Sequence, residues 1–360
     1  VFDAQVSNQK NDNLSIKNVS IKDLTFDSEV KKNGFDELNH QLSAHGVSNF
    51  KVENCNFIGF LGDGIAISAG SDLQINSYAY NKNISIKNCN FDGVNKDNRQ
   101  GISIYYADGF LIENCNFKNI TRDDMPGAID IEPDKDFLVS RNGVINNCTF
   151  ENIGGIAAIV VHTKLPNKEN EFSNKNFVIK NCKFNNVRTA FSVIGNDHFL
   201  NLESKEYGTI FQDCVVTNSK SIADIRKAYN VLFKNIIFKN INNEGLNTVT
   251  DGGAVNITFE QCSFDTISNP NGIGFYGTTR NINFIGCRFE NFKANAITIN
   301  DYEGVGTISD NFFMSSNYPQ AFPVVTSNFK DKKRIMKSLF KNNKSQNNFR
   351  GAGIDFFYKK

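Results

Sequence analysis

The chain has 360 residues, of which 40% are hydrophobic, and its 39 Lys and Arg residues nearly balance its 38 Asp and Glu residues. A chain of this kind can bury a sizeable core, and its balanced charge argues against a nucleic-acid partner or an anionic membrane surface. No apolar run approaches the roughly 20 residues of a transmembrane helix, so we expect no membrane insertion. There is no secretory signal and no initiating Met, so we expect a mature form or a fragment of something longer.

A six-residue segment of the form I-x-N-C-x-F recurs along the chain. Clear copies are VENCNF at Val52, IKNCNF at Ile86, IENCNF at Ile112 and IKNCKF at Ile179. The fourth position of the segment defines a register at Val19, Cys55, Cys89, Cys115, Cys148, Cys182, Cys214, Ile236, Cys262, Cys287 and Asn311, with spacings of 22 to 36 residues. A constant segment at variable spacing is typical of a solenoid with loop insertions, and alternation within the segment favours strand. We therefore predict an all-β, single-stranded parallel β-helix of about eleven coils with terminal caps.

All eight Cys residues fall on this register. Coils of a β-helix stack about 4.8 Å apart, so we expect the thiols to form an internal stack of small buried side chains. A disulfide framework is the alternative interpretation. An Asn often precedes the register position and is expected to form a structural ladder, at Asn18, Asn54, Asn88, Asn114, Asn147, Asn181 and Asn235. The Phe that recurs two residues after the register position is expected to lie in the core.

Each coil also holds a second short strand, such as GIAI at Gly64, GISI at Gly101, AIDI at Ala128 and AIVV at Ala158. Alternate residues of a strand point outward, so stacked strands present outward columns. Charge gathers in the middle coils of these columns, at Asp130, Glu132, Asp134, His162, Lys164, Asp224 and Arg226. Tyr105, Tyr276 and Tyr302 share the columns and offer ring faces for sugars. The alternative is an ordinary solvated face with salt bridges.

The candidate catalytic residues are Glu132, Asp130 and His162. Asp130 and Glu132 are two residues apart, which places their side chains about 7 Å apart on one face of a strand. Paired carboxylates are the working groups of most glycosidases, so we assign Glu132 as the general acid and Asp130 as the base or nucleophile. His162 lies one coil away and is expected to tune or relay the proton of Glu132, or simply to pair with it.

The remaining charged positions are candidates for substrate binding. Asp224 and Arg226 are expected three coils away, about 14 Å by the coil spacing, where Arg226 would bind an anionic sugar. Asp134 and Lys164 complete this group. Asp63 is expected to be a turn residue and His40 a loop residue. No cluster has the spacing of a Ca²⁺ or Zn²⁺ site, so we expect no metal and no cofactor.

The sequence resembles the right-handed parallel β-helix proteins that act on polysaccharides, and most of all the bacteriophage tailspike depolymerases. The resemblance covers roughly residues 15 to 315 and depends on the coil repeat, on HGVSNFKVENCNFIGFLGDGIAI from His45 and on GAIDIEP from Gly127. It implies a pectate-lyase-like solenoid, a bacterial capsular polysaccharide or exopolysaccharide as substrate, a homotrimer, and a location in the virion tail or outside the cell. The motifs of pectin hydrolases, pectate lyases and alginate epimerases are not found, so no catalytic set is carried over.

We predict a β-helix with an N-terminal cap over residues 1–315. Residues 316–360 are expected to form a C-terminal cap or an oligomer contact, with a short amphipathic helix in DKKRIMKSLFKNNK from Asp331. The predicted function is polysaccharide depolymerisation by glycoside hydrolysis. One alternative is a polysaccharide lyase of the same fold, with His162, Lys164 or Arg226 as its base. The other is a β-helix that binds glycan or serves as a structural shaft without catalysis.

Overall fold

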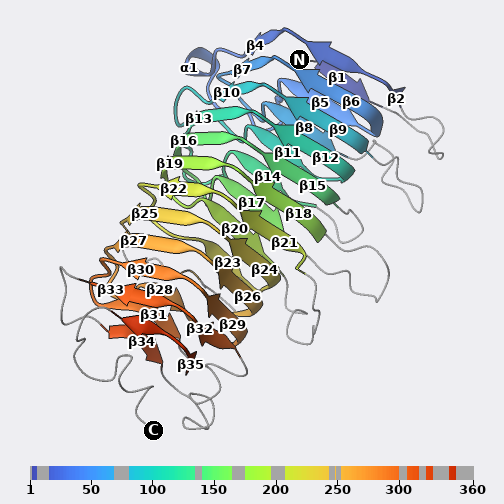
Figure 1. Cartoon of the computed structure of the whole chain (residues 1–360). Helices are drawn as coiled ribbons and strands as arrows, with labels where there is room; N and C mark the ends of the chain where they lie inside the picture. Colours follow the sequence, from blue (N-terminus) through green and yellow to red (C-terminus); the bar gives the residue numbers. More distant parts are fainter. Residues whose placement is uncertain are drawn as a thin grey trace. The chain divides into compact units, whose positions relative to one another are not determined.

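The structure is a computed structural model that describes residues 2–5, 16–68, 81–133, 140–163, 175–195, 207–242, 248, 253–299, 306–315, 322–326 and 340–345. The chain divides into two compact units, Val1–Arg188 and Thr189–Lys360, and each is built from parallel strands (Figure 1). The described residues contain one short helix, α1 (Val30–Asn33). None of their helices is long and apolar enough to span a membrane.

The first unit winds through three parallel sheets, which we call A, B and C, and successive coils add strands to each. Sheet A contains β1 (Phe2–Gln5), β5 (Leu42–His45), β8 (Ile65–Ser68), β11 (Ile102–Ile104), β14 (Ile129–Ile131) and β17 (Ile159–His162). Sheet B contains β2 (Ile16–Lys17), β3 (Ser20–Lys22), β6 (Val47–Glu53), β9 (Lys82–Lys87), β12 (Ala107–Glu113), β15 (Ser140–Asn146) and β18 (Lys175–Lys180). Sheet C contains β4 (Thr25–Asp27), β7 (Asn56–Ile58), β10 (Asn90–Asp92), β13 (Asn116–Ile120), β16 (Thr149–Ile153) and β19 (Lys183–Val187).

The second unit has two long parallel sheets and two short ones. One long sheet contains β21 (Thr209–Gln212), β24 (Ala228–Lys234), β26 (Ala254–Glu260), β29 (Thr279–Ile285), β32 (Thr307–Ser309) and β35 (Phe340–Lys341). The other contains β22 (Val215–Thr217), β25 (Ile237–Ile241), β27 (Ser263–Ile267), β30 (Arg288–Glu290), β33 (Phe312–Met314) and β36 (Lys344–Ser345). The short sheets are β20 (Phe191–Ile194) with β23 (Asp224–Arg226), and β28 (Ile273–Phe275) with β31 (Asn295–Ile299) and β34 (Phe322–Thr326).

Strand pairing in the second unit continues past residue 315, through β34, β35 and β36. The amphipathic helix expected from Asp331 lies mainly outside the described residues. Its described end is not helical, because Phe340–Lys341 and Lys344–Ser345 are strands that pair with the preceding coil. A helix as short as this segment is only marginally stable by itself, whereas pairing with the preceding strand supplies backbone hydrogen bonds.

The repeated N-C dipeptide lies at a corner between two strands, so the prediction of a continuous strand there was wrong. Asn114 follows β12 with a φ of 56°, in the left-handed region, and β13 starts two residues later. This corner interrupts the alternation of side chains, so Ile112 and Cys115 are both fully buried although they are three residues apart. Asn tolerates this conformation better than most residues do, which explains why it recurs.

The expected Asn ladder is confirmed. The side-chain amide of Asn88 donates to Oδ1 of Asn54 (3.3 Å), that of Asn114 to Asn88 (3.2 Å), and that of Asn147 to Asn114 (2.8 Å). Each amide is both donor and acceptor, so one residue type can satisfy an entire column of corners.

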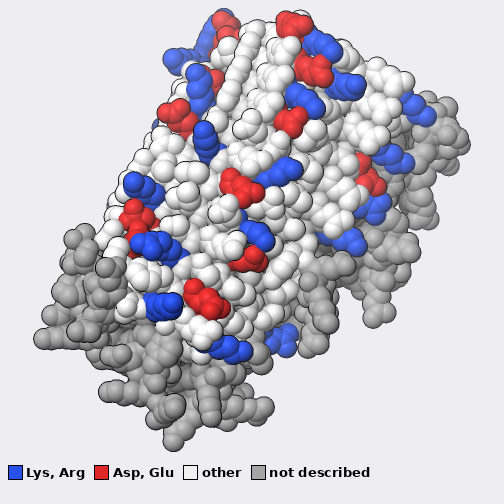
Figure 2. All heavy atoms as spheres, in the orientation of Figure 1, with Lys and Arg blue, Asp and Glu red and all other residues white. Residues whose placement is uncertain are grey.

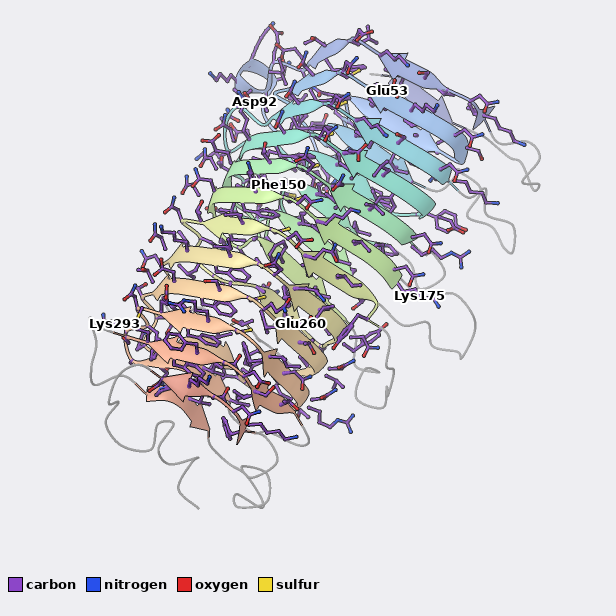
Figure 3. All side chains as sticks on the ribbon, in the orientation of Figure 1. Glu53, Asp92, Phe150, Lys175, Glu260 and Lys293 are labelled. Atoms are coloured by element: carbon purple, nitrogen blue, oxygen red, sulfur yellow. The ribbon has the colours of Figure 1, made fainter. Side chains whose placement is uncertain are left out.

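The core contains the expected column of aromatic rings. Phe57, Phe91, Phe117, Phe150 and Phe184 are at most 1% exposed and stack with ring centroids 4.7–4.9 Å apart. Figure 3 shows Phe150 inside the coil, whereas Glu53 and Asp92 lie at its surface. The ring spacing matches the spacing of parallel strands, so the aromatic column and the sheets reinforce one another.

The Cys residues are free thiols, each at most 1% exposed, which excludes the disulfide framework. Burial raises the pKa of the Cys55 thiol, and a hydrogen bond with Cys115 together with burial raises that of Cys89. Because only an accessible thiolate reacts quickly, we expect no thiol of the native protein to react with a disulfide reagent within minutes. All eight should react after denaturation, and rapid labelling of several thiols in the native protein would contradict the internal stack.

The surface mixes charges of both signs, as the face in Figure 2 shows. In the first unit Lys22 pairs with Glu53 (2.6 Å), Lys87 with Glu113 (3.0 Å) and Lys118 with Asp92 (3.2 Å). These pairs link neighbouring coils and neutralise one another locally. They contribute little stability because the side chains are partly exposed to solvent.

Candidate functional site

The outward columns of sheet A have the predicted register. Asp130 pairs with Ser103 on one side and with Val160 on the other. The expected exposure of this column is wrong, however, because Ser103, Asp130 and Val160 are at most 1% exposed. Gln100, from the turn that leads into β11, lies against Asp130 and donates from Nε2 to its Oδ2 (3.4 Å). The turns before the strands therefore bury groups that the strand pattern alone places in solvent.

Asp130, Glu132 and His162 form one cluster, as predicted. Glu132 follows the end of β14, and His162 ends β17, the next strand of sheet A. Nε2 of His162 lies 3.7 Å from Oε1 of Glu132. One ligand atom from each of the three residues lies within 4.8 Å of the others, closer than the 7 Å expected for the carboxylate pair. The Glu132 side chain is 34% exposed and that of His162 is 11% exposed, so solvent reaches the cluster mainly through Glu132.

Burial is the main cause that raises the pKa of Asp130 well above its ordinary value. The charge of Glu132, a hydrogen bond between the two carboxyl groups and the charge of Asp63 raise it further, whereas Arg99 lowers it. A carboxyl group in this setting keeps a proton that an exposed one would lose. The carboxyl group that holds a proton is thus Asp130, whereas the sequence assigned the general acid to Glu132.

A buried ion pair lies beside the cluster, and the sequence interpretation missed it. Asp63 is fully buried, and its Oδ1 accepts a hydrogen bond of 2.5 Å from Arg99, whose side chain is 12% exposed. The same Oδ1 is 3.4 Å from the backbone N–H of Gln100, which also contacts Asp130. Asp63 is thus a turn residue, as predicted, but it also belongs to the polar network of the site.

His40 and Tyr105 complete this network. The backbone N–H of Asp63 donates to Nδ1 of His40 (2.9 Å), so this nitrogen carries no proton. Burial lowers the pKa of His40, which keeps the ring neutral, and the 3.4 Å approach to Asp63 Oδ2 is then not an ion pair. Arg99 also donates to the hydroxyl of Tyr105 (3.0 Å), whose pKa is raised mainly by burial. Tyr105 therefore holds Arg99 in place, in addition to the sugar contact that the sequence predicts for it.

One signal in the sequence could have identified the turn residues. Gln41, Asp63 and Gln100 each precede a strand of sheet A directly or by one Gly. Neighbouring coils approach closely there: a Cβ added at Gly64 would lie only 2.7 Å from the carbonyl oxygen of Gly101. A polar residue beside such a close approach is expected to be buried with it and to need a partner.

The other predicted binding residues lie elsewhere. In the second unit, Arg226 contacts Asp224 through two nitrogens, with Nε 3.0 Å from Oδ1 and Nη2 2.7 Å from Oδ2. The Arg226 side chain is still 41% exposed. Tyr276, also in the second unit, is half-buried, and burial raises its pKa. Asp134, Lys164 and Tyr302 lie outside the described residues.

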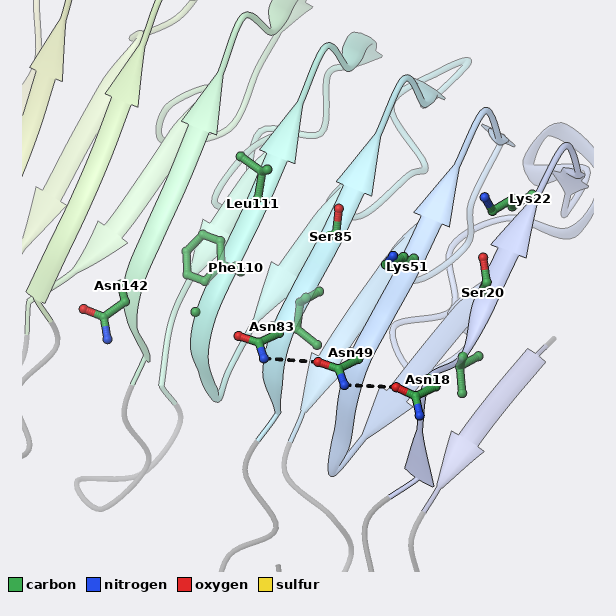
Figure 4. Close-up of a pocket in the computed structure, with 13 residues that line it drawn as sticks. Asn18, Ser20, Lys22, Asn49, Lys51, Asn83, Ser85, Phe110, Leu111 and Asn142 are labelled. Carbon is green, nitrogen blue, oxygen red and sulfur yellow. Dashed lines mark hydrogen bonds between the residues drawn. The ribbon is translucent and has the colours of Figure 1, made fainter.

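A shallow groove of about 720 Å³ runs over sheet B of the first unit (Figure 4). Three Asn side chains cross it in a hydrogen-bonded row, Asn83 to Asn49 (3.1 Å) and Asn49 to Asn18 (3.0 Å). Its charged lining residues are Lys22 and Lys51, and it contains no carboxylate or His. It can hold polar ligands, but its lining residues include no acid–base pair.

Residues 9–178 match the family model described as a right-handed β-helix region. Two solved structures of bacteriophage phi29 gene product 12 are similar to this chain. The pre-mature protein matches 87% of this chain with a TM-score of 0.59 and 14% sequence identity. The N-terminal fragment matches 90% of this chain with a TM-score of 0.58 and 13% sequence identity. The match spans 43% and 59% of those two chains. A search of curated proteins found no match. The chain thus has the right-handed parallel β-helix fold that the sequence resemblance implied.

Proposed function

We propose that this right-handed parallel β-helix protein cleaves a polysaccharide by glycoside hydrolysis at Glu132, Asp130 and His162. The observation that carries the proposal is the contact of two carboxyl groups with a His from the next coil. Most glycosidases use a pair of carboxyl groups next to the glycosidic bond that they cleave. Similarity of fold alone would not support a function, because β-helices serve several.

Glu132 is the member of the cluster that meets the glycan, because its side chain is 34% exposed whereas Asp130 is 1% exposed. In our proposal Glu132 donates a proton to the glycosidic oxygen as the general acid. Asp130 remains the candidate base or nucleophile, so the proton that burial keeps on Asp130 must first pass to Glu132, and Glu132 must turn toward the sugar to expose Asp130. The carboxyl oxygens lie within 4.8 Å of one another, below the separation of about 6.5–9.5 Å found in inverting enzymes, which favours a retaining arrangement. His162 relays or tunes the proton of Glu132.

The substrate and setting are proposed from the similar solved structures and from the sequence resemblance. Both similar solved structures are gene products of a bacteriophage, which supports a virion component acting on a bacterial capsular polysaccharide or exopolysaccharide. The tailspike resemblance further implies a homotrimer. Light scattering that gives a monomer would remove the tailspike assignment and leave a β-helix enzyme.

The test is incubation with a panel of capsular polysaccharides and exopolysaccharides, followed by mass spectrometry of the products. Hydrolysis adds one water per cleaved bond. Products with the mass of an elimination and an ultraviolet-absorbing double bond would identify a lyase instead. Glycan that is bound but stays intact after long incubation would indicate a binding or structural role.

We expect EDTA to leave the rate of glycan cleavage unchanged, because proton transfer by Glu132 requires no metal ion. The measurement compares product formation with and without chelator, after dialysis. A loss of activity that Ca²⁺ restores would contradict hydrolysis and favour the lyase.

A further inference from the structure

We propose that Asp130, Glu132 and His162 form a binding site for a divalent transition-metal ion such as Zn²⁺, and that the bound ion inhibits the enzyme. The inhibition rests on the proposed function, whereas the binding site does not.

The geometry places two oxygen ligands and one nitrogen ligand together. Among the described residues, this is the group of Asp, Glu, His and Cys side chains whose ligand atoms converge, within 4.8 Å of one another. Ligands bound to one Zn²⁺ lie about 2.0–2.2 Å from it, so their atoms must approach somewhat more closely than this. Glu132 is the half-exposed member and has the freedom to close the remaining gap.

A second observation, an unpaired buried acceptor, points to a cation. Oδ1 of Asp130 is buried and has no hydrogen-bond donor among the described residues, although the side chain lies inside the cluster. A buried acceptor without a partner costs free energy, and a bound cation removes that cost. The charges agree, because Glu132 and Asp63 act on Asp130 and Arg99 offsets Asp63, so a cation at Asp130 would take the place of the proton there.

The ligand set selects the kind of ion. Ca²⁺ and Mg²⁺ prefer sites made of oxygen ligands, whereas an imidazole nitrogen beside carboxylates suits Zn²⁺ and its first-row neighbours. An ion at this place would occupy the carboxylate oxygens that the proposed reaction needs. A coordinated Glu132 cannot give a proton to the glycan, so occupancy and hydrolysis exclude one another.

Zn²⁺ binding to the chelator-treated full chain, measured by titration calorimetry without glycan, tests the site. We expect Glu132→Gln and His162→Gln each to weaken binding at least tenfold, and Glu151→Gln, an exposed Glu on β16, to leave it unchanged. Anomalous diffraction at the zinc edge should place the ion between the three side chains. An ion located elsewhere, or an affinity that neither variant changes, would overturn the site.

The inhibition has its own readout. On a glycan that the protein cleaves, saturating Zn²⁺ should stop cleavage and EDTA should restore it, while Ca²⁺ at the same concentration should have no effect. Undiminished cleavage at saturating Zn²⁺ would overturn the inhibition. Specific binding of Zn²⁺ by a protein that cleaves no glycan would overturn the proposed function and leave the metal site standing.

Discussion

Replacing Glu132 with Gln should lower the turnover of the natural glycan by about a hundredfold or more, which is the usual contribution of a general acid. Gln keeps the shape of the side chain and removes the proton that the reaction needs. Because the side chain is partly exposed, the change should alter stability by only about half a kcal/mol. Turnover is measured as the rate of product formation at saturating glycan, with the unfolding midpoint as a check on the fold.

The matched control is Glu151→Gln, because Glu151 is an exposed carboxylate of the same unit on sheet C, away from the cluster. It should keep normal turnover. Asp130→Asn should also lose turnover, since Asp130 is the second carboxyl group of the pair. If Glu132→Gln and Asp130→Asn each keep near-normal turnover, the cluster is not the active site, and Asp224 and Arg226 become the next candidates.

Replacing Asp63 with Ala should destabilise the protein by about 3–5 kcal/mol, because it leaves Arg99 charged and almost buried, with the exposed Glu37, 3.6 Å away, as its remaining carboxylate partner. The loss should appear as a lower unfolding midpoint in guanidinium chloride. Turnover should fall as well, because Asp63 anchors the turn from which Gln100 contacts Asp130.

The control for this prediction is Lys22→Ala. It removes the ion pair between Lys22 Nζ and Glu53 Oε2, whose distance of 2.6 Å is similar to that of the Asp63–Arg99 pair. Lys22 is half exposed, so water replaces the lost partner and the midpoint should hardly move. The double variant Asp63→Leu with Arg99→Met should be more stable than Asp63→Ala, since no unpaired charge stays buried. Equal unfolding midpoints for Asp63→Ala and Lys22→Ala would show that burial does not strengthen the ion pair between Asp63 and Arg99.

The coil, its stacks and its columns could be predicted because each follows from a local pattern repeated many times. One Cys or Phe says little, but the same residue at every register predicts that copies lie one strand spacing apart. The same logic brought Asp130 and Glu132 next to His162, although they are about thirty residues apart in the chain. The position of the corner was harder to predict from the sequence. An Asn with a left-handed backbone conformation, such as Asn114, cannot be told by its residue type from an Asn within a strand.

The surroundings of the site were decided by tertiary structure alone. The strand pattern shows that Asp130 points away from the core, but its burial depends on the turn that carries Gln100. Only the polar residue before the strand recurs in that turn, and the path of the turn depends on the contacts of Asp63 with Arg99 and His40. Repetition therefore determined which side chains stack, whereas single, non-repeated contacts determined which of them are buried, which hold protons and which a ligand can reach.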